Sequence, residues 1–588
     1  GAGARAGPAR SAVARLAKGG GRGRTAPNHQ PQRVSNMSAA GPRAPHPGAP
    51  HKPRANGPLR TLVAMAVVFL AFAAVAGQLV RLALDGQATM SSTMSQTVGQ
   101  SFARPDIVDR QGRLLATDVE AYSLFADPAH VIDRDEVVEK LGAVFPDLDR
   151  GKLRDDLRDR KRRFVWVRRG LSPKTAQRVH NLGLPGLDFR RELRRAYPGG
   201  ALAGHVLGYV NIDNKGVSGI ERYLDESIGV ESVQAATLAD RAPVRLSLDI
   251  GVQHAVEAEL ADAVRLYQAK GAAGVVLDVR SGEVLASASY PQVDPAHPTM
   301  SLDPVRADKL AGSTFELGSV FKAFTVAMAL DGGYVTTGTL IDASEPLKAG
   351  RFTIKDLHAV GRPMSVADVF IHSSNIGAAK LGLLAGPDYM RSFLKRMQLL
   401  GELKTEAGTV APPQVPQRWG DVETMTVAYG HGLAVAPLQF AAAAGALVNG
   451  GYEVRPTYVK RAADAGNAKV QLIDAATSAM VRDFMRRNVT DPAGTGKRAD
   501  VPGYSVGGKT GTAEIPGPGG YREKAVISSF LASFPMDRPE YVVLVLLFEP
   551  KPTAASSHKV LAGLNAAPTT GRIIERIGPL LGGTAVPY

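Results

Sequence analysis

Ser319 and Lys322 are the residues of this 588-residue sequence whose types and spacing most directly suggest covalent chemistry. They stand three positions apart in the run Gly318-Ser319-Val320-Phe321-Lys322. In a helix such positions share one face, so an unprotonated Lys322 could take the hydroxyl proton of Ser319 and make it a nucleophile. The residues from Ser319 to Leu330 include no Gly or Pro and predict a helix that ends at Asp331-Gly332-Gly333. Ser319 would then lie at a helix start, where backbone N–H groups stabilise negative charge.

Two later motifs distinguish this serine from the other Ser-x-x-Lys matches, which begin at Ser392 and Ser556. Ser319 is the one match that is followed first by Ser373-Ser374-Asn375 and then by Lys509-Thr510-Gly511-Thr512. The three elements in this order are the signature of penicillin-binding proteins and serine β-lactamases. The order of the motifs therefore favours an acyl-transfer site over a chance match.

A second motif points elsewhere and is rejected. The run from Gly503 to Thr510 matches the phosphate-binding pattern G-x-x-x-x-G-K-[ST]. That loop must open a helix whose N–H groups hold the phosphates. The residues that follow include Pro516-Gly517-Pro518-Gly519-Gly520, which cannot form a helix. We therefore expect Lys509 on a strand and no nucleotide site.

The composition sets further limits. The chain contains no cysteine, which excludes disulfides, thiolate metal sites and cysteine nucleophiles. Twelve scattered histidines show no metal-ligand spacing, so we expect neither a metal nor a cofactor. The net charge of +15 is concentrated at the start, because the first 60 residues hold eleven Lys and Arg and no acid. This uneven distribution argues against nucleic acid as the partner.

The first 80 residues predict a tail and a membrane anchor. Residues 1–60 are rich in Gly, Pro, Ala and Arg and predict a disordered basic tail in the cytoplasm. Residues 61–80 form the one long apolar run, which is long enough to cross a bilayer. The basic side stays in the cytoplasm, so everything after Arg81 is placed outside it. The alternative is a signal peptide cleaved after Ala74-Val75-Ala76, but the run is long for one.

Residues 81–240 predict a mixed α/β non-catalytic pedestal, a dimerisation-type domain. Arg104 to Ala116 suggests an extended segment, a turn and a strand, and Asp133 to Arg163 suggests a solvated helical region. Arg194 to Tyr223 pairs arginines with acids but offers no nucleophile with a base. We interpret these charges as structural ion pairs and His205 as a structural histidine.

Residues 241–580 predict an α+β domain with one antiparallel sheet packed by helices. A hairpin is expected at Gly274 to Tyr290. Val366 to Leu384 is helical in pattern, with the Ser-Ser-Asn triplet interrupting it on a turn, and Gln439 to Val448 predicts a buried Ala-rich helix. Three strand-like runs close the domain, namely Tyr504 to Glu514, Ala525 to Phe534 and Tyr541 to Phe548.

With these features in place, the sequence resembles the class B penicillin-binding proteins, and most closely their division-specific peptidoglycan D,D-transpeptidase family, FtsI. The resemblance covers nearly the whole chain after Arg60, including the anchor, the Arg104 to Ala116 element, the Arg195 to Asp225 segment and the three motifs. One departure is Leu317, where the family leads us to expect proline. That change should alter the turn rather than the chemistry.

The resemblance implies catalytic roles for five residues. Ser319 would attack the carbonyl between the last two D-alanines of a stem peptide and form an acyl-enzyme. Lys322 would take the hydroxyl proton, for which burial and the second cation Lys509 must lower its pKa. Ser373 would relay the proton to the departing D-Ala nitrogen, and Asn375 would hydrogen-bond the substrate amide and Lys322.

The resemblance also implies substrate-binding roles for Thr510, Gly511 and Thr512. The two threonine hydroxyls, together with Lys509, would hold the terminal carboxylate of the substrate. The backbone N–H groups of Ser319 and Thr512 would form the oxyanion hole. β-Lactam antibiotics resemble the D-Ala-D-Ala terminus and should trap Ser319.

Several functions share these motifs. We expect a septal transpeptidase of the bacterial inner membrane, single-pass, with its catalytic domain in the periplasm. An elongation-specific class B transpeptidase is the nearest alternative, and Ser-Ser-Asn rather than an Asp-ended triplet favours division. A β-lactam sensor, a β-lactamase and a non-catalytic divisome scaffold are further alternatives. The expected partners are stem peptides, β-lactams, membrane lipid, an FtsW-type glycosyltransferase and other divisome proteins.

Overall fold

The computed structural model describes residues 62–63, 65–76, 78, 103–228, 242–350, 352–462, 470–517 and 520–582. The predicted basic tail, residues 1–60, lies outside this part of the chain. Within the predicted anchor, residues 61–80, every described residue is helical. No helix formed by the described residues has both the length and the apolar character that a membrane crossing requires. The anchor therefore stays a prediction from the sequence.

A five-stranded antiparallel sheet carries the third motif and confirms the predicted hairpin and the three late strands. The strand order across the sheet is β14-β15-β16-β6-β7. The strands are β6 (Gly271–Asp278), β7 (Val284–Tyr290), β14 (Gly507–Gly517), β15 (Gly520–Phe534) and β16 (Tyr541–Phe548). Segments at opposite ends of the domain thus pair directly, because β16 lies between β15 and β6.

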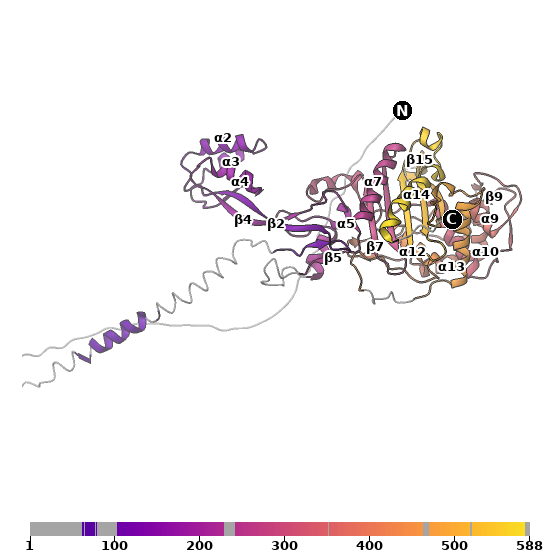
Figure 1. Cartoon of the computed structure of the whole chain (residues 1–588), viewed down its shortest axis with the longest axis horizontal. Helices are drawn as coiled ribbons and strands as arrows, with labels where there is room; N and C mark the ends of the chain where they lie inside the picture. Colours follow the sequence, from indigo (N-terminus) through magenta and orange to yellow (C-terminus); the bar gives the residue numbers. More distant parts are fainter. Residues whose placement is uncertain are drawn as a thin grey trace, which may run out of the picture. The chain divides into compact units, whose positions relative to one another are not determined.

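Helices pack against this sheet, as the sequence predicted, and they cover both of its faces (Figure 1). The central strand β16 is buried along its whole length, which explains its unbroken apolar sequence. Its alternate residues Val543, Val545 and Leu547 pack with α7 (Ile250–Leu266) and α14 (Ala566–Ile577). Those between them join the larger core on the other face, which includes α8 (Lys322–Asp331), α12 (Pro437–Val448) and α13 (Ala475–Thr490).

The Ser-Ser-Asn triplet lies where two helices meet, as predicted. Helix α9 (Val366–Ile371) ends just before it, and α10 (Asn375–Arg396) begins with its asparagine. The Ala-rich helix α12 is buried at every position, also as predicted. The helix expected from Ser319 is right in extent but differs at its start. Gly318–Phe321 forms a tighter 3-10 turn (η5), and the α-helix α8 begins at Lys322.

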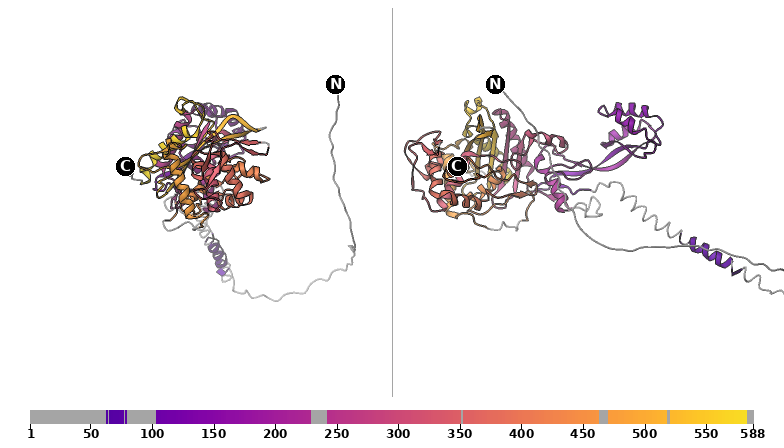
Figure 2. Two further views of the ribbon diagram at one scale, coloured as in Figure 1. Left: turned by 90° about the vertical axis from the view of Figure 1, so that its right-hand side faces the viewer. Right: turned by 180° about the vertical axis from the view of Figure 1, so that it is seen from behind.

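A second sheet and three helices form the pedestal, in which β2 and β4 run as a long ribbon towards α2, α3 and α4 (Figures 1 and 2). These three helices share a small core of their own. The predicted strand and helical region are therefore confirmed. The elements are β1 (Ile107–Val108), β2 (Leu114–Ala126), β3 (Val165–Leu171), β4 (Leu187–Ala196), β5 (Val244–Arg245), α2 (Arg134–Val144), α3 (Arg150–Asp156) and α4 (Pro173–His180).

The remaining elements are short and lie along the chain between or after those already described. They are α5 (Gly204–Leu207), α6 (Gly219–Tyr223), η1 (Leu224–Ile228), η3 (Pro298–Leu302), η4 (Pro304–Arg306), β8 (Leu340–Asp342), β9 (Leu347–Ala349), β10 (Phe352–Ile354), β11 (Pro363–Ser365), β12 (Lys404–Thr405), β13 (Gly408–Thr409), α11 (Asp421–Ala428), η6 (Lys497–Ala499), η7 (Ala554–Ser556), η8 (Ala562–Leu564) and η9 (Pro579–Leu581).

The charged residues of the pedestal form a buried structural network, as predicted. The Glu221 carboxylate accepts hydrogen bonds from Arg104 Nε at 2.9 Å and from Arg195 Nε at 2.7 Å. Arg195 also pairs with Asp118, and the side chains of Arg195, Glu221 and Asp118 are all 0% exposed. His205 is structural too, with its Nε2 2.7 Å from the carbonyl oxygen of Arg306. The network joins β2, β4 and α6 to the start of the pedestal chain.

Replacing Glu221 with alanine is expected to destabilise the protein by about 3–5 kcal/mol, because it leaves two buried guanidinium groups short of a carboxylate. Urea unfolding followed by circular dichroism measures the change. Asp135→Ala is the matched control, since Asp135 pairs with Arg154 at an exposed position. The control should leave the unfolding midpoint in place, and an equal effect of both variants would contradict the structural importance of the network.

Candidate active site

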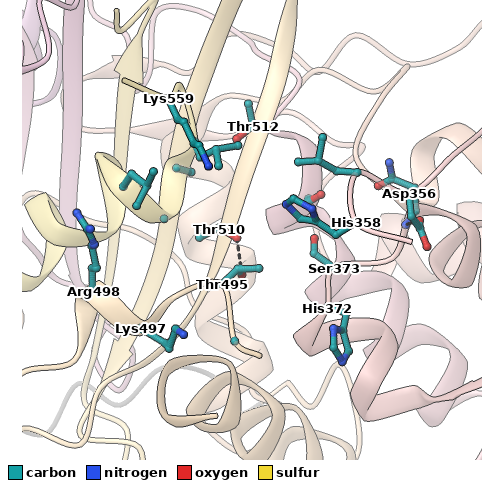
Figure 3. A pocket seen from close by; sticks show the side chains of 18 of the residues that line it. Asp356, His358, His372, Ser373, Thr495, Lys497, Arg498, Thr510, Thr512 and Lys559 are labelled. Carbon is teal, nitrogen blue, oxygen red and sulfur yellow. Dashed lines mark hydrogen bonds between the residues drawn. The ribbon is translucent and has the colours of Figure 1, made fainter. Parts of the chain in front are cut away.

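A cavity of about 680 Å³ lies beside β14, and five of the predicted site residues line it, namely Ser319, Ser373, Asn375, Thr510 and Thr512. Figure 3 shows Thr510 and Thr512 along one wall and Ser373 on the opposite side. Lys322 and Lys509 are 0% exposed and lie behind this surface. The structure thus brings the three sequence motifs together around one space, although their first and last residues are almost 200 positions apart.

The turn that presents Ser319 is pressed against β14. Gly318 adopts φ +60°, and a Cβ there would lie 2.6 Å from the carbonyl oxygen of Thr512, so glycine is required. The Ser529 hydroxyl donates to the carbonyl oxygen of Leu317 at 3.2 Å. Leu317 itself has φ −100°, outside the narrow range that a proline ring would hold. A proline at position 317 would therefore require a different φ and a different turn.

Lys322 makes the central contacts of the site. Its Nζ lies 3.1 Å from Ser319 Oγ, 3.2 Å from Ser373 Oγ and 2.7 Å from Asn375 Oδ1. It also donates to the carbonyl oxygen of Ser373 at 2.6 Å. A neutral amine has one lone pair, so it can accept the proton of Ser319 while its own N–H groups stay bonded to oxygen. The arrangement is that of a nucleophile with its general base.

The backbone at Ser373 is unusual in a way that serves Lys322. Ser373 has φ +59°, a left-handed conformation that a non-glycine residue adopts at a cost of about 1–3 kcal/mol. The bend lets α10 begin at Asn375 and directs the Ser373 carbonyl at the Lys322 amine. Local strain at this turn therefore places both a carbonyl and a hydroxyl around one nitrogen.

Two buried lysines give the site its electrostatics. Burial lowers the pKa of Lys322 well below its ordinary value, the positive charge of Lys509 lowers it further, and Asp356 opposes the shift. Burial also lowers the pKa of Lys509 to about 7. The Lys509 Nζ lies 5.6 Å from the centre of the Phe370 ring, a contact that favours its charged form. The site thus places a base with a strongly lowered pKa beside an amine that keeps part of its positive charge at pH 7.

The third motif lies on a strand, which confirms the rejection of a phosphate-binding loop. No helix follows Lys509, because β14 continues to Gly517. A Cβ on Gly511 would lie 2.4 Å from Ser529 Oγ and 2.5 Å from the carbonyl oxygen of Leu317, so glycine lets the strand meet the nucleophile turn. The Thr510 hydroxyl lies 2.7 Å from that of Thr495. Thr495 is a cavity residue that the sequence analysis did not find.

Asp356 is a second residue that the motifs did not predict. It accepts hydrogen bonds from the Ser374 hydroxyl at 2.7 Å, from the Asn375 N–H at 2.5 Å and from the Ile376 N–H at 3.0 Å. It therefore fixes the start of α10, where a carboxylate is favoured by the helix dipole. No spacing rule identifies it, because it lies 18 positions before Ser374 in an irregular segment.

His431 is a third such residue. Its ring lies between those of Tyr429 and Tyr521, at centroid distances of 5.2 and 5.9 Å. Burial, and then the charge of Lys322, lowers its pKa to about 4, so it is neutral at pH 7. The adjacent Gly432 N–H and the Tyr521 hydroxyl both donate to Glu316, just before the nucleophile turn. The glycines on either side of His431 were the only sequence signal.

The described residues offer no set of side chains that could bind a metal ion. No group of three or more His, Asp or Glu side chains is placed among them to hold an ion. The predicted site residues supply the hydroxyls of Ser319, Ser373, Thr510 and Thr512, the amines of Lys322 and Lys509 and the amide of Asn375.

Comparisons with known families match this geometry. The family model of the penicillin-binding protein transpeptidase domain matches residues 272–567. That of the penicillin-binding protein dimerisation domain matches residues 100–234. Together these matches cover most of the pedestal and the sheet with the helices α8 to α13, and they leave out α7 and most of α14.

Individual proteins are similar over most of their length. A probable peptidoglycan D,D-transpeptidase FtsI of Caulobacter vibrioides is 40% identical over 492 residues, 82% of each chain. The peptidoglycan D,D-transpeptidase FtsI of Escherichia coli is 28% identical over 81% of this chain and 83% of its own. Penicillin-binding protein 3 of Mycobacterium tuberculosis, solved with aztreonam, has a TM-score of 0.63 and 25% identity, over 83% of this chain and 98% of its own.

Lys509→Met should shift the pH dependence of Ser319 acylation by a fluorescent penicillin. Loss of the neighbouring charge raises the pKa of Lys322, so less of the neutral base is present at a given pH. We expect the rate constant at pH 7 to fall by roughly 10²-fold and to recover partly as the pH is raised. Lys551→Met, an exposed lysine that does not line the cavity, is the control. A reduced rate with an unchanged pH profile would contradict this electrostatic role.

Asp356→Ala should lower the same acylation rate by about tenfold or more, because small displacements of reacting groups are costly. The loss of a helix cap should also cost about 1–2 kcal/mol of stability. Asp149→Ala is the matched control, since Asp149 caps α3 in the pedestal. It should cost similar stability and leave acylation unchanged, and equal acylation rates in the two variants would show that Asp356 only stabilises the fold.

Proposed function

The chain belongs to the FtsI family of class B penicillin-binding proteins, and from that premise we propose that it is a septal peptidoglycan D,D-transpeptidase that works through a Ser319 acyl-enzyme. One observation carries the assignment of the nucleophile. The wholly buried Lys322 amine lies 3.1 Å from Ser319 Oγ and has its pKa lowered by burial and by Lys509. Such an amine can act as a base at neutral pH.

Acylation then proceeds in two linked proton transfers. Ser319 Oγ attacks the carbonyl carbon between the last two D-alanines while Lys322 accepts its proton. The tetrahedral oxyanion is held by the N–H groups of Ser319 and Thr512, each worth about 3 kcal/mol. Ser373, which contacts the same amine, passes a proton to the departing D-Ala nitrogen. The products are free D-alanine and an ester on Ser319.

Substrate binding falls to the β14 side of the cavity. Thr510 and Thr512 line it, and together with the charge of Lys509 they hold the terminal carboxylate of the stem peptide. Gly511 allows the close approach of the strand to the nucleophile turn. Asn375 accepts a hydrogen bond from Lys322 on Oδ1 at 2.7 Å and donates from Nδ2 to the Lys355 carbonyl oxygen at 3.1 Å, so it positions the base, and Nδ2 would exchange that carbonyl for the substrate. A side-chain amine of a neighbouring stem peptide then takes the acyl group and forms the cross-link.

The other functions considered are less well supported. A β-lactamase needs a base for a deacylating water, and Asp356, one of the two carboxylates lining the cavity, already accepts three hydrogen bonds. A scaffold without catalysis would not need a strained turn around a buried amine. Relatives named FtsI favour division over elongation.

The remaining expectations complete the proposal. We assign residues 1–60 to a cytoplasmic tail, 61–80 to the anchor, 81–240 to the pedestal and 241–580 to the transpeptidase domain. The protein would then lie at the septum in the inner membrane with its catalytic domain in the periplasm. Its protein partners would be an FtsW-type glycosyltransferase and other divisome proteins, and its small-molecule inhibitors would be β-lactams.

The first test is covalent labelling of the purified full chain with a fluorescent penicillin. Wild type should form an adduct that survives denaturation, and Ser319→Ala should lose it entirely, because the ester oxygen is absent. Ser392→Ala is the matched control, since it changes another Ser-x-x-Lys serine on α10. Labelling that persists in Ser319→Ala would place the nucleophile elsewhere, and a folded wild type that does not label would favour the scaffold.

A further inference from the structure

We propose that Lys497, Arg498 and Lys559, called the cationic rim below, form a subsite for the carboxylates of the acceptor peptide. All three are exposed and line the cavity on its β14 side (Figure 3). The inference rests on the proposed function, because it assigns a part of the same site to the second substrate.

The cationic rim lies next to the place where the donor chain ends. Lys497 and Arg498 belong to η6, directly after Thr495, whose hydroxyl lies 2.7 Å from that of Thr510. Lys559 comes from the loop between η7 and η8. In Figure 3 Lys497 and Arg498 lie on the Thr495 and Thr510 side of the cavity, Lys559 lies beside Thr512, and Asp356, His358 and Ser373 lie on the opposite side. Two segments about 60 positions apart thus present like charges to one space.

In the described part of the chain, the three charged groups of the cationic rim do not stabilise the fold through ion pairs. Among the ion pairs of the described residues, none involves Lys497, Arg498 or Lys559. Lys497 Nζ donates to the carbonyl oxygen of Pro492 at 2.7 Å, which leaves its charge uncompensated. Three like charges around one concave surface repel each other and favour an anion between them.

The acids that line the cavity lie away from the rim. Asp356 is held by three donors at the start of α10. Glu514 lies on β14 four positions beyond Thr510, about 13 Å along the strand. Its charge also raises the pKa of Glu316, which places it near the nucleophile turn and the β14–β15 hairpin. The cavity is therefore positive at its Thr510 end and negative towards its Glu514 end.

The direction in which the donor peptide runs determines whether the donor or the acceptor peptide contacts the cationic rim. Its terminal carboxylate lies at Thr510, and the carbonyl under attack lies at the Thr512 N–H. The rest of the donor therefore runs along β14 towards Glu514, away from the cationic rim. The leaving D-alanine occupies the Thr510 end, and the acceptor amine must approach the ester carbonyl from the side that D-alanine vacates.

The acceptor reaction balances with the groups present. The amine nitrogen bonds to the ester carbonyl carbon, the bond from that carbon to Ser319 Oγ breaks, and a proton passes from the nitrogen through Lys322 to Ser319 Oγ. No oxidant or further reactant is required. An acceptor stem peptide carries free carboxylates besides its amine, so its body would extend from Thr510 into the cationic rim. The rim then selects an anionic amine over water or a neutral amine.

The test measures transfer against hydrolysis on the full chain in mild detergent. The donor is a D-alanyl thioester that acylates Ser319, and the acceptor is a synthetic stem peptide with a free side-chain amine and free carboxylates. A twin peptide with carboxamides in place of the carboxylates reports contacts that do not depend on charge. Lys497→Glu/Arg498→Glu and Lys559→Glu are compared with Lys551→Glu, an exposed lysine that does not line the cavity.

We expect wild type to prefer the carboxylate peptide, and the preference to fall as salt is raised. The double reversal should raise the KM for that peptide by about tenfold. Lys559→Glu should act in the same direction, and Lys551→Glu should leave the KM within about twofold of wild type. Penicillin acylation and the KM for the carboxamide twin should stay unchanged in all of them.

Each other outcome overturns part of the argument. Equal losses with both peptides, or no loss with either, would exclude a carboxylate subsite at the rim. A parallel loss of penicillin acylation would assign the cations to the donor side. A wild type that penicillin does not label would remove the proposed function itself, whereas labelling with no charge preference among acceptors would remove this inference alone.

Discussion

The rest of the site depends on one constraint, which is that the amine of Lys322 is buried completely and still surrounded by oxygen atoms. An ammonium ion without water is costly, and a neutral amine there is both cheaper and more reactive. Three separate segments must converge to make this possible. The nucleophile turn supplies one hydroxyl, the strained turn at Ser373 supplies a carbonyl and a second hydroxyl, and β14 supplies the neighbouring positive charge. Each segment is held in turn by contacts outside the site.

Those outer contacts come from opposite sides of the domain. The sheet fixes β14 through pairing with β15, and β16 anchors both because it is buried on its two faces. The nucleophile turn is then pressed onto β14 through Gly318 and Gly511. On the other side, Asp356 fixes the first turn of α10 and with it Asn375. The chemistry therefore sits between a rigid sheet and a set of helices, and neither alone holds a complete site.

The sequence was sufficient for the parts of this arrangement that depend on local pattern. Motif order identified Ser319, Lys322, Ser373, Asn375 and Lys509, and apolar runs predicted the strands and the buried helix α12. Local pattern could not give the 3-10 turn at Gly318, because contacts with Thr512 and Ser529 from a distant strand impose it. Asp356 and His431 were missed for the same reason, since their roles exist only after remote segments meet.

The same geometry suggests why an amine, rather than water, would attack the Ser319 ester. Water is abundant, so transfer can compete only if the acceptor is held beside the ester, where effective concentrations reach about 10⁵ M or more. In the proposed function the donor side of the cavity is committed to one peptide, because β14 and the oxyanion N–H groups would fix its direction. A second peptide has only the Thr510 end left, and that end is bounded by unpaired cations. By our inference, charge there would position the acceptor, as hydrogen bonds along the strand would position the donor.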